Sequence, residues 1–153
     1  MVGRFLSSDG KLLAIIQPSS KNPAESSVEI RAVGGKSICQ RDFGSPGGDH
    51  GKRVVEGAWT PDSQFFVWSM ENSGGHSPWN WPTYVFDRKS SKVLSLDQLV
   101  GGITTSAVIF KGSHTLTTER LDTKRASNVP CEVKLDELLR RTQATTKTKP
   151  SRP

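Results

Sequence analysis

The side chains that could perform acid–base, nucleophilic or metal chemistry are few and widely spaced in this sequence. His50, His76 and His114 stand at no metal-ligand spacing, and no H-E-x-x-H or paired-carboxylate motif accompanies them. The G-x-S-x-G pattern of a nucleophile elbow is absent. The glycine-rich segment from Phe43 to Arg53 has an arginine where a phosphate-binding loop requires serine or threonine, so we expect a connecting loop there. The sequence therefore predicts no catalytic residue, no metal site and no cofactor, and we expect a protein that is not an enzyme.

A second group of residues could bind a ligand without reacting with it. Residues 59–87 hold all four tryptophans, the only tyrosine and three of the six phenylalanines of the chain. The loop from Gly74 to Pro82 opens with two glycines and contains two prolines, so Trp79 and Trp81 project the same way from an extended segment. Paired indole rings can bind a peptide, a partner protein or a sugar ring, or they can fold back and seal one end of the molecule. The candidate contact residues are His76, Trp79, Asn80 and Trp81.

The elements that would position these side chains repeat along the chain. The segment "SSDGKLLAII" (residues 7–16) aligns with "TPDSQFFVWS" (residues 60–69), which places Asp9 on Asp62. Each copy has an Asp turn followed by an apolar run of strand length. We expect the two aspartates to occupy equivalent turns, each accepting a hydrogen bond from a backbone N–H just downstream.

Two further similarities extend the repeat. The segment "VEIRAVGGKSI" (residues 28–38) aligns with "YVFDRKSSKVL" (residues 84–94) at a shift of 56, and each predicts a hairpin with a two-residue turn. A third, degenerate copy covers residues 106–139, where Gly112 and Ser113 replace the Asp turn. We expect this copy to end in a strand and a short helix.

Repeats of about 50 residues built from strands and tight turns are typical of propellers and solenoids. The two Asp-turn segments resemble blades of TolB-like and WD-repeat-like β-propellers, and the resemblance covers about residues 5–139. The WD-repeat dipeptides, Gly-His early and Trp-Asp late in each blade, are absent, which favours the TolB-like group. The resemblance implies an all-β fold of three propeller-blade-like antiparallel β-sheet repeats, at about residues 1–52, 53–104 and 105–139. A β-sandwich of about eleven strands is the alternative.

The number of blades has a consequence for assembly. Propellers close with about four to eight blades, and closure removes exposed sheet edges. Three blades leave edges open. We therefore expect either a partial or truncated propeller that belongs to a longer chain, or a homo-oligomer that pairs its open edges.

The net charge of +6 is concentrated at the C-terminal end. Residues 140–153 carry five basic residues and no acidic one, which leaves 16 basic and 15 acidic residues, or +1, for the remainder. We expect a single all-β domain at residues 1–139 and a disordered basic tail at residues 140–153. Nucleic acid would then bind only nonspecifically, through that tail.

Membrane, export and redox signals are weak. The longest apolar run, Leu12 to Ile16, is far too short to span a bilayer, and no signal peptide is recognisable. We expect a cytoplasmic protein by default, with export as the alternative if an upstream segment is missing from this sequence. Cys39 and Cys131 have the spacing of neither a zinc site nor a redox motif, and we expect two buried free thiols, with one disulfide as the alternative.

The sequence leaves two functions open. The first is a non-catalytic interaction module, built on propeller-like blades, that binds a protein or a peptide. The second is a small-molecule or carbohydrate-binding domain, or an accessory domain of an enzyme, that uses the Trp-rich loop at residues 74–82. Tryptophan fluorescence quenched by a sugar and lost in Trp79→Ala would favour the second function.

Overall fold

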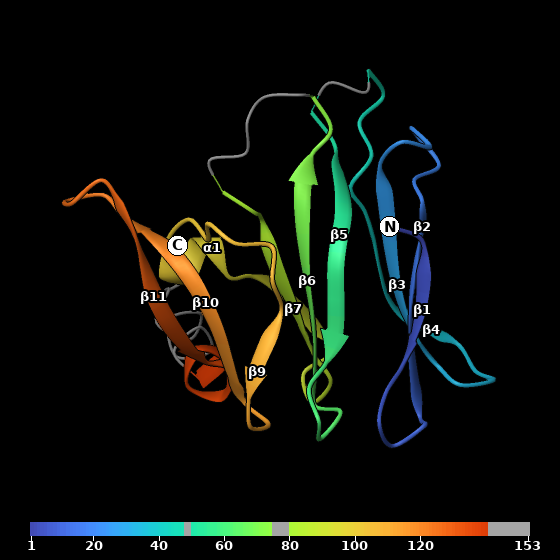
Figure 1. Ribbon diagram of the computed structural model, residues 1–153. Helices are drawn as coiled ribbons and strands as arrows, with labels where there is room; N and C mark the ends of the chain where they lie inside the picture. Colours follow the sequence, from blue (N-terminus) through green and yellow to red (C-terminus); the bar gives the residue numbers. More distant parts are fainter. Residues whose placement is uncertain (48–49, 75–79, 141–153) are drawn as a thin grey trace, which may run out of the picture.

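The computed structural model of the chain describes residues 1–47, 50–74 and 80–140. Three antiparallel sheets lie side by side as layers (Figure 1). Sheet 1 contains β1 (Gly3–Leu6), β2 (Leu12–Pro18), β3 (Ser26–Ala32) and β4 (Ser37–Asp42), and sheet 2 contains β5 (Lys52–Trp59), β6 (Phe65–Asn72), β7 (Thr83–Asp87) and β8 (Lys92–Ser95). Sheet 3 contains β9 (Ile109–Lys111), β10 (Thr115–Asp122) and β11 (Ser127–Lys134). The predicted all-β class is confirmed, and three open sheets are compatible with a partial propeller and with a sandwich.

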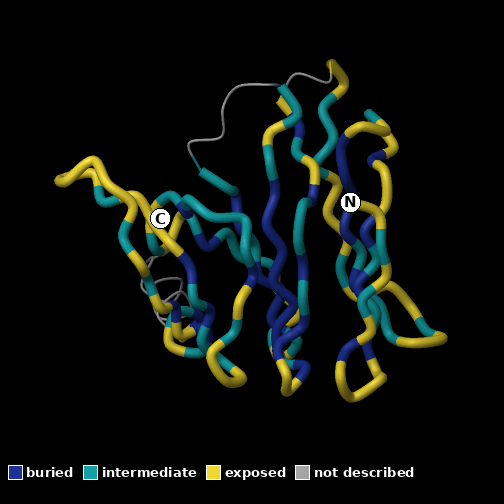
Figure 2. The backbone as a smooth tube through the Cα atoms, viewed as in Figure 1, coloured by how far each residue is buried: buried dark blue, intermediate teal, exposed yellow. Residues whose placement is uncertain are grey.

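Sheet 2 is the middle layer and is buried on both faces (Figure 2). Phe66 and Trp68 of β6 belong to the apolar core shared with sheet 1. Phe65 and Val67 belong to a second core shared with sheet 3. Successive side chains of a strand point to opposite faces, so a central strand needs apolar residues at every position. This arrangement explains why so many aromatic residues gather in one segment of the sequence.

The two Asp turns are equivalent, as predicted from the repeat. Asp9 Oδ1 accepts hydrogen bonds from the Ser7 hydroxyl at 2.7 Å and from the Lys11 N–H at 3.2 Å. Asp62 Oδ1 accepts the same pair of bonds, from the Thr60 hydroxyl at 2.7 Å and from the Gln64 N–H at 3.2 Å. The residue after each aspartate has a positive φ, 70° at Gly10 and 63° at Ser63. The conformation of the turn between β1 and β2, and of the turn between β5 and β6, is therefore determined by residues that are neighbours in the sequence.

The hairpin alignment at a shift of 56 is wrong by one residue. Ala14 pairs with Ile30 in sheet 1, and its equivalent Val67 pairs with Val85 in sheet 2, so the true shift between Ile30 and Val85 is 55. A slip of one residue would turn every side chain of the strand to the other face. The connecting turns are also longer than predicted, with residues 33–36 between β3 and β4 and residues 88–91 between β7 and β8.

Sheet 3 departs from the other two sheets. The turn between β9 and β10 has three residues, with a φ of 71° at Gly112, and it lacks the aspartate. After β11, residues 135–140 are helical, as expected for the end of the third copy, and no fourth strand follows within the described residues. Another short helix, α1 (Asp97–Val100), leads from sheet 2 towards sheet 3. Of the predicted tail only Arg140 lies in the described ranges, where it is helical and not disordered.

The cysteines lie in different sheets. Cys39 of β4 and Cys131 of β11 are half-buried free thiols, and burial raises the pKa of Cys39. None of the described helices has the length and apolar character that a bilayer crossing requires.

Candidate functional site

The predicted contact residues of the Trp-rich loop are only partly placed. His76 and Trp79 lie outside the described residues. Asn80 and Trp81 are half-buried and fixed: Asn80 Nδ2 donates to Asp97 Oδ1 at 3.3 Å, and the Trp81 N–H donates to the Ile103 carbonyl at 2.6 Å. Asp97 also accepts from the N–H groups of neighbouring segments, at 2.7 Å and 3.1 Å. The end of the loop is therefore anchored next to α1, and the ligand-binding role of the loop stays a prediction.

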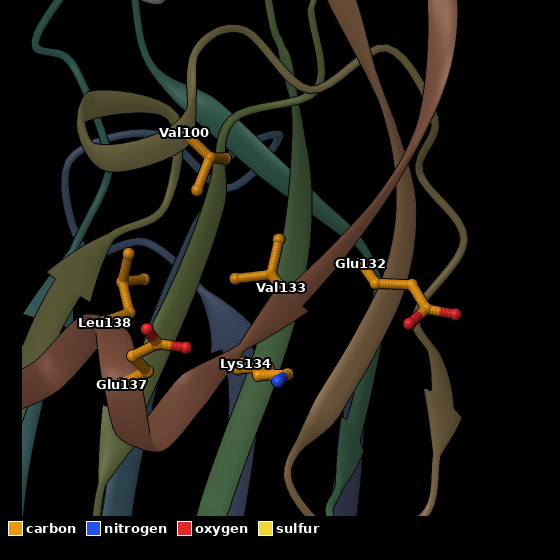
Figure 3. Close-up of a pocket in the computed structure, with 6 residues that line it drawn as sticks. All are labelled: Val100, Glu132, Val133, Lys134, Glu137 and Leu138. Carbon is orange, nitrogen blue, oxygen red and sulfur yellow. The ribbon is translucent and has the colours of Figure 1, made fainter.

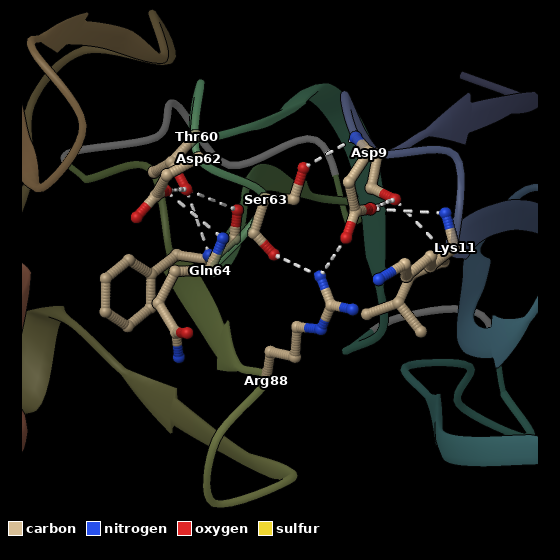
Figure 4. A network of polar contacts seen from close by, with 10 residues as sticks. Asp9, Lys11, Thr60, Asp62, Ser63, Gln64 and Arg88 are labelled. Carbon is tan, nitrogen blue, oxygen red and sulfur yellow. Dashed lines mark hydrogen bonds and ion pairs between the residues drawn. The ribbon is translucent and has the colours of Figure 1, made fainter.

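The opposite end of the molecule carries a polar network that joins the sheets (Figure 4). The Asp9 N–H donates to the Ser63 hydroxyl at 3.1 Å, and Arg88 Nη1 donates to Asp9 Oδ2 at 2.7 Å. The Arg88 guanidinium, together with the Ser7 hydroxyl, holds the pKa of Asp9 well below its usual range. The Asp turn of sheet 1 is in this way tied to two turns of sheet 2.

A second tie at this end joins sheet 2 to sheet 3 through a histidine. His114, in the turn between β9 and β10, contacts Asp62 through Nε2 and Asp136 through Nδ1. Its ring meets Phe65 edge-on, with ring centroids 5.5 Å apart and an interplanar angle of 81°. The three charged groups come from the β5–β6 turn, the β9–β10 turn and the helical residues 135–140, so they bring three segments together.

Both carboxylates favour the protonated imidazole. The hydrogen bond to Asp62 raises the pKa of His114, burial opposes this, and the charge of Asp136 raises it further. Burial alone would raise the pKa of Asp62, but hydrogen bonds from Thr60 and His114 hold it below its ordinary value. A neutral imidazole has one N–H donor, whereas the imidazolium has two, so only the charged ring can donate to both aspartates at once.

A cavity of 660 Å³ opens beside His114, between sheets 2 and 3. Phe65 and Leu139 supply apolar surface, and Lys89 and Arg140 are the other basic side chains that line it. Asp87 also lines the cavity, and its two oxygens accept bonds from Gln64 Nε2, from the Lys89 and Ser90 N–H groups and from the Ser90 hydroxyl. The cavity therefore combines an apolar wall with positive charges, and its carboxylates are held within the chain.

A smaller cavity of 270 Å³ lies along β11 (Figure 3). Val100, Val133 and Leu138 supply its apolar surface, and Glu132 and Glu137 are among its charged residues. Across residues 1–47, 50–74 and 80–140, no three His, Cys, Asp or Glu side chains are grouped so as to hold a metal ion.

The glycine-rich segment between sheets 1 and 2 packs against a buried carboxylate and donates hydrogen bonds to it. Glu25 is 1% exposed, and it accepts hydrogen bonds from the Ser45 N–H, from the Ser45 hydroxyl at 3.0 Å and from the Ser73 hydroxyl. The Ser73 bond lowers the pKa of Glu25, burial opposes this, and the Ser45 bonds lower it further. A Cβ at Gly51 would meet this carboxylate at 1.9 to 2.1 Å, so no side chain fits there. Residues 43–47, 50 and 51 of this segment lie between β4 and β5, as expected of a connecting loop, and Lys52 and Arg53 begin β5.

Sequence reasoning missed the His114 cluster. Asp62 and Asp136 stand 52 and 22 residues from His114, so no local spacing connects them. The one available signal was the repeat alignment, which places the turn before β10 at the same end of its sheet as the Asp turns.

Comparison with known proteins adds little to this geometry. No protein-family model and no curated protein matches the sequence. A crystal structure of a puromycin hydrolase mutant complexed with PGG is similar at a TM-score of 0.30 and 12% identity, over 89% of this chain and 27% of that chain. The chain thus spans about a quarter of the length of that protein, and a likeness at this TM-score carries no conclusion about fold or function.

Proposed function

We propose that this chain is a non-catalytic interaction module that binds an acidic peptide segment of a partner protein between sheets 2 and 3. The observation that carries the proposal is the 660 Å³ cavity, which combines apolar surface with basic side chains. Binding sites for small ligands commonly have volumes of about 300 to 1,000 Å³, and a few side chains of a peptide fit the same space.

The charges around the cavity favour an acidic ligand. The three carboxylates that line it are already engaged by His114 and by turn residues, as described above. Among the described residues, neither the Lys89 ammonium nor the Arg140 guanidinium forms an ion pair with a carboxylate. An Asp or Glu side chain entering the cavity would therefore meet two basic groups that are available for charge-assisted hydrogen bonds.

Two features favour binding over catalysis. Both imidazole nitrogens of His114 contact carboxylates, so neither is free to take a proton from a substrate. The Ser90 hydroxyl, which lines the cavity, donates to Asp87 and is not paired with a histidine base.

The repeated Asp turns and the two four-stranded meanders support a related proposal, that the three sheets are propeller blades of the TolB-like or WD-repeat-like kind. Carbohydrate binding by the loop at residues 74–82 has no such support from the described residues.

Selection of a random-peptide library on the folded chain tests the proposed function. We expect enrichment of peptides with Asp or Glu. Lys89→Ala and Arg140→Ala should each weaken the affinity of such a peptide about two- to fivefold, which is the size of an exposed charge pair, measured by titration calorimetry.

Lys36→Ala is the matched control, because Lys36 is exposed in the turn of sheet 1 that is equivalent to the turn of Lys89. The Lys36→Ala variant should bind the selected peptide with the same affinity as the unmodified chain. Peptides without acidic residues, or acidic peptides that bind the Lys89 and Arg140 variants unchanged, would overturn the proposal.

A further inference from the structure

One face of sheet 1 carries apolar side chains that contribute to neither described core. Leu13 and Ile15 alternate along β2 with the residues that face sheet 2, so they point to the opposite side. Both are half-buried, and Leu6, which pairs with Leu13 from β1, is 60% exposed. We call this set, with the residues that flank it on β1 and β3, the outer face of sheet 1. In Figure 1, sheet 1 is the last layer on its side of the stack.

The repeat shows which residues of sheet 2 are equivalent to those on the outer face of sheet 1. At a shift of 53, its three apolar residues are equivalent to Trp59, Phe66 and Trp68 of sheet 2. These three are at most 9% exposed and pack against sheet 1. The same face of the sheet is therefore a sheet-packing face in sheet 2, and in sheet 1 no described element covers it.

The other end of the stack is different. The face of sheet 3 that points away from sheet 2 carries Thr115 and Thr117, an ion pair of 2.8 Å between Lys111 and Glu132, and Ile109, which is 57% exposed. The outward face of sheet 3 thus has one exposed isoleucine beside threonines and an ion pair, whereas the outer face of sheet 1 groups three apolar side chains on two adjacent strands.

Two of the charged residues on the outer face of sheet 1, Arg4 and Glu29, hold complementary positions, and Arg31 lies in the neighbouring row beside Leu13. Strand pairing places Arg4, Ile15 and Glu29 in one row across β1, β2 and β3. Arg4 and Glu29 are two strand spacings apart, roughly 10 Å between their backbones, and among the described residues they form no ion pair with each other. A two-fold axis parallel to β2 would stack Ile15 and Leu13 on their own copies. The same axis places Arg4 of each copy opposite Glu29 of the other.

We propose that the outer face of sheet 1 is the interface of a two-fold dimer, with a second copy of this chain as its occupant. The contact is isologous, because each copy presents the same patch. It buries the exposed apolar row and forms two Arg4–Glu29 ion pairs between copies.

Sedimentation equilibrium at micromolar concentration tests this interface. We expect twice the 16.7 kDa mass of one chain. Ile15→Glu should give a monomer, because two carboxylates would meet at the axis. Thr115→Glu is the matched control: it adds the same charge to the outward face of sheet 3, between Lys111 and Lys134, and should leave the dimer intact.

A charge swap distinguishes loss of the dimer interface from loss of folding in the Ile15→Glu variant. Arg4→Glu and Glu29→Arg should each raise the dimer dissociation constant roughly five- to tenfold, since each places like charges opposite one another. The double variant should return the constant to that of the unmodified chain. A monomeric unmodified chain, a dimer that survives Ile15→Glu, or a double variant as weak as either single one would overturn the proposal.

Discussion

At the scale of single residues, His114 determines how the contact between sheets 2 and 3 depends on pH. Asp62 and Asp136 contact its two nitrogens, and Asp87, Lys89 and Arg140 line the same cavity. The hydrogen bond to Asp62 raises the pKa of His114 in the folded chain above the ordinary 6.5. The stabilisation of the folded state by the protonated His114 is therefore fully present below pH 6.5. It is lost as the pH rises through the raised pKa, when one N–H donor disappears.

We therefore expect the free energy of unfolding to fall as the pH rises above about 6.5, and to fall less in His114→Gln. Urea unfolding at a series of pH values measures this. His50→Gln is the control and should keep the pH dependence of the unmodified chain. Equal pH dependence in the His114 variant and the unmodified chain would show that the tie contributes nothing to stability.

At the scale of elements, β6 is the strand on which both cores depend. Phe66 is fully buried, and its ring lies 5.2 Å from that of Trp59 and 5.8 Å from that of Trp68. We expect Phe66→Ala to lower the free energy of unfolding by about 3 to 5 kcal/mol, because removing a buried ring leaves a cavity. Urea unfolding gives the value.

Leu121 of β10 provides the comparison, since it is 37% exposed. Leu121→Ala should change the free energy of unfolding by less than about 1 kcal/mol. Similar losses in the two variants would contradict the assignment of β6 to a doubly buried position.

At the scale of the whole molecule, the basic tail and the Trp-rich loop are alternatives to the cavity between sheets 2 and 3 as the binding element. Residues 142–153 contain one apolar residue, Ala144, so we expect their deletion to leave both folding and partner binding intact. Circular dichroism and the peptide titration measure this. Any nucleic-acid binding should disappear with the tail and weaken steeply with salt, because each neutralised phosphate releases a counterion.

The double variant Trp79→Ala with Trp81→Ala is the counterpart of the deletion. If the loop binds the ligand, this variant should weaken binding more than the deletion does while the fold is kept. Unfolding of the double variant would instead assign the tryptophans to the core. Binding lost with the tail alone would contradict the placement of the ligand on the folded body.

Sequence patterns determined the features that depend on near neighbours. Both Asp turns were predictable, because the side chain of Asp9 or Asp62 bonds to groups two residues away. The all-β class followed from apolar runs of strand length, and Phe65, Phe66 and Trp68 of one such run pack in the two cores. Such features need only the local chain and the hydrophobic effect.

Tertiary structure alone decided the register of the second hairpin and the partners of His114. The shift of 56 rested on residue likeness, whereas the true shift of 55 follows from the strand pairing of Ala14 with Ile30 and of Val67 with Val85. The contact of His114 with Asp62 and Asp136 joins turns of different sheets, and it exists only once the sheets have stacked. Stacking depends on the summed packing of two whole faces, and no spacing within one segment of sequence encodes that sum.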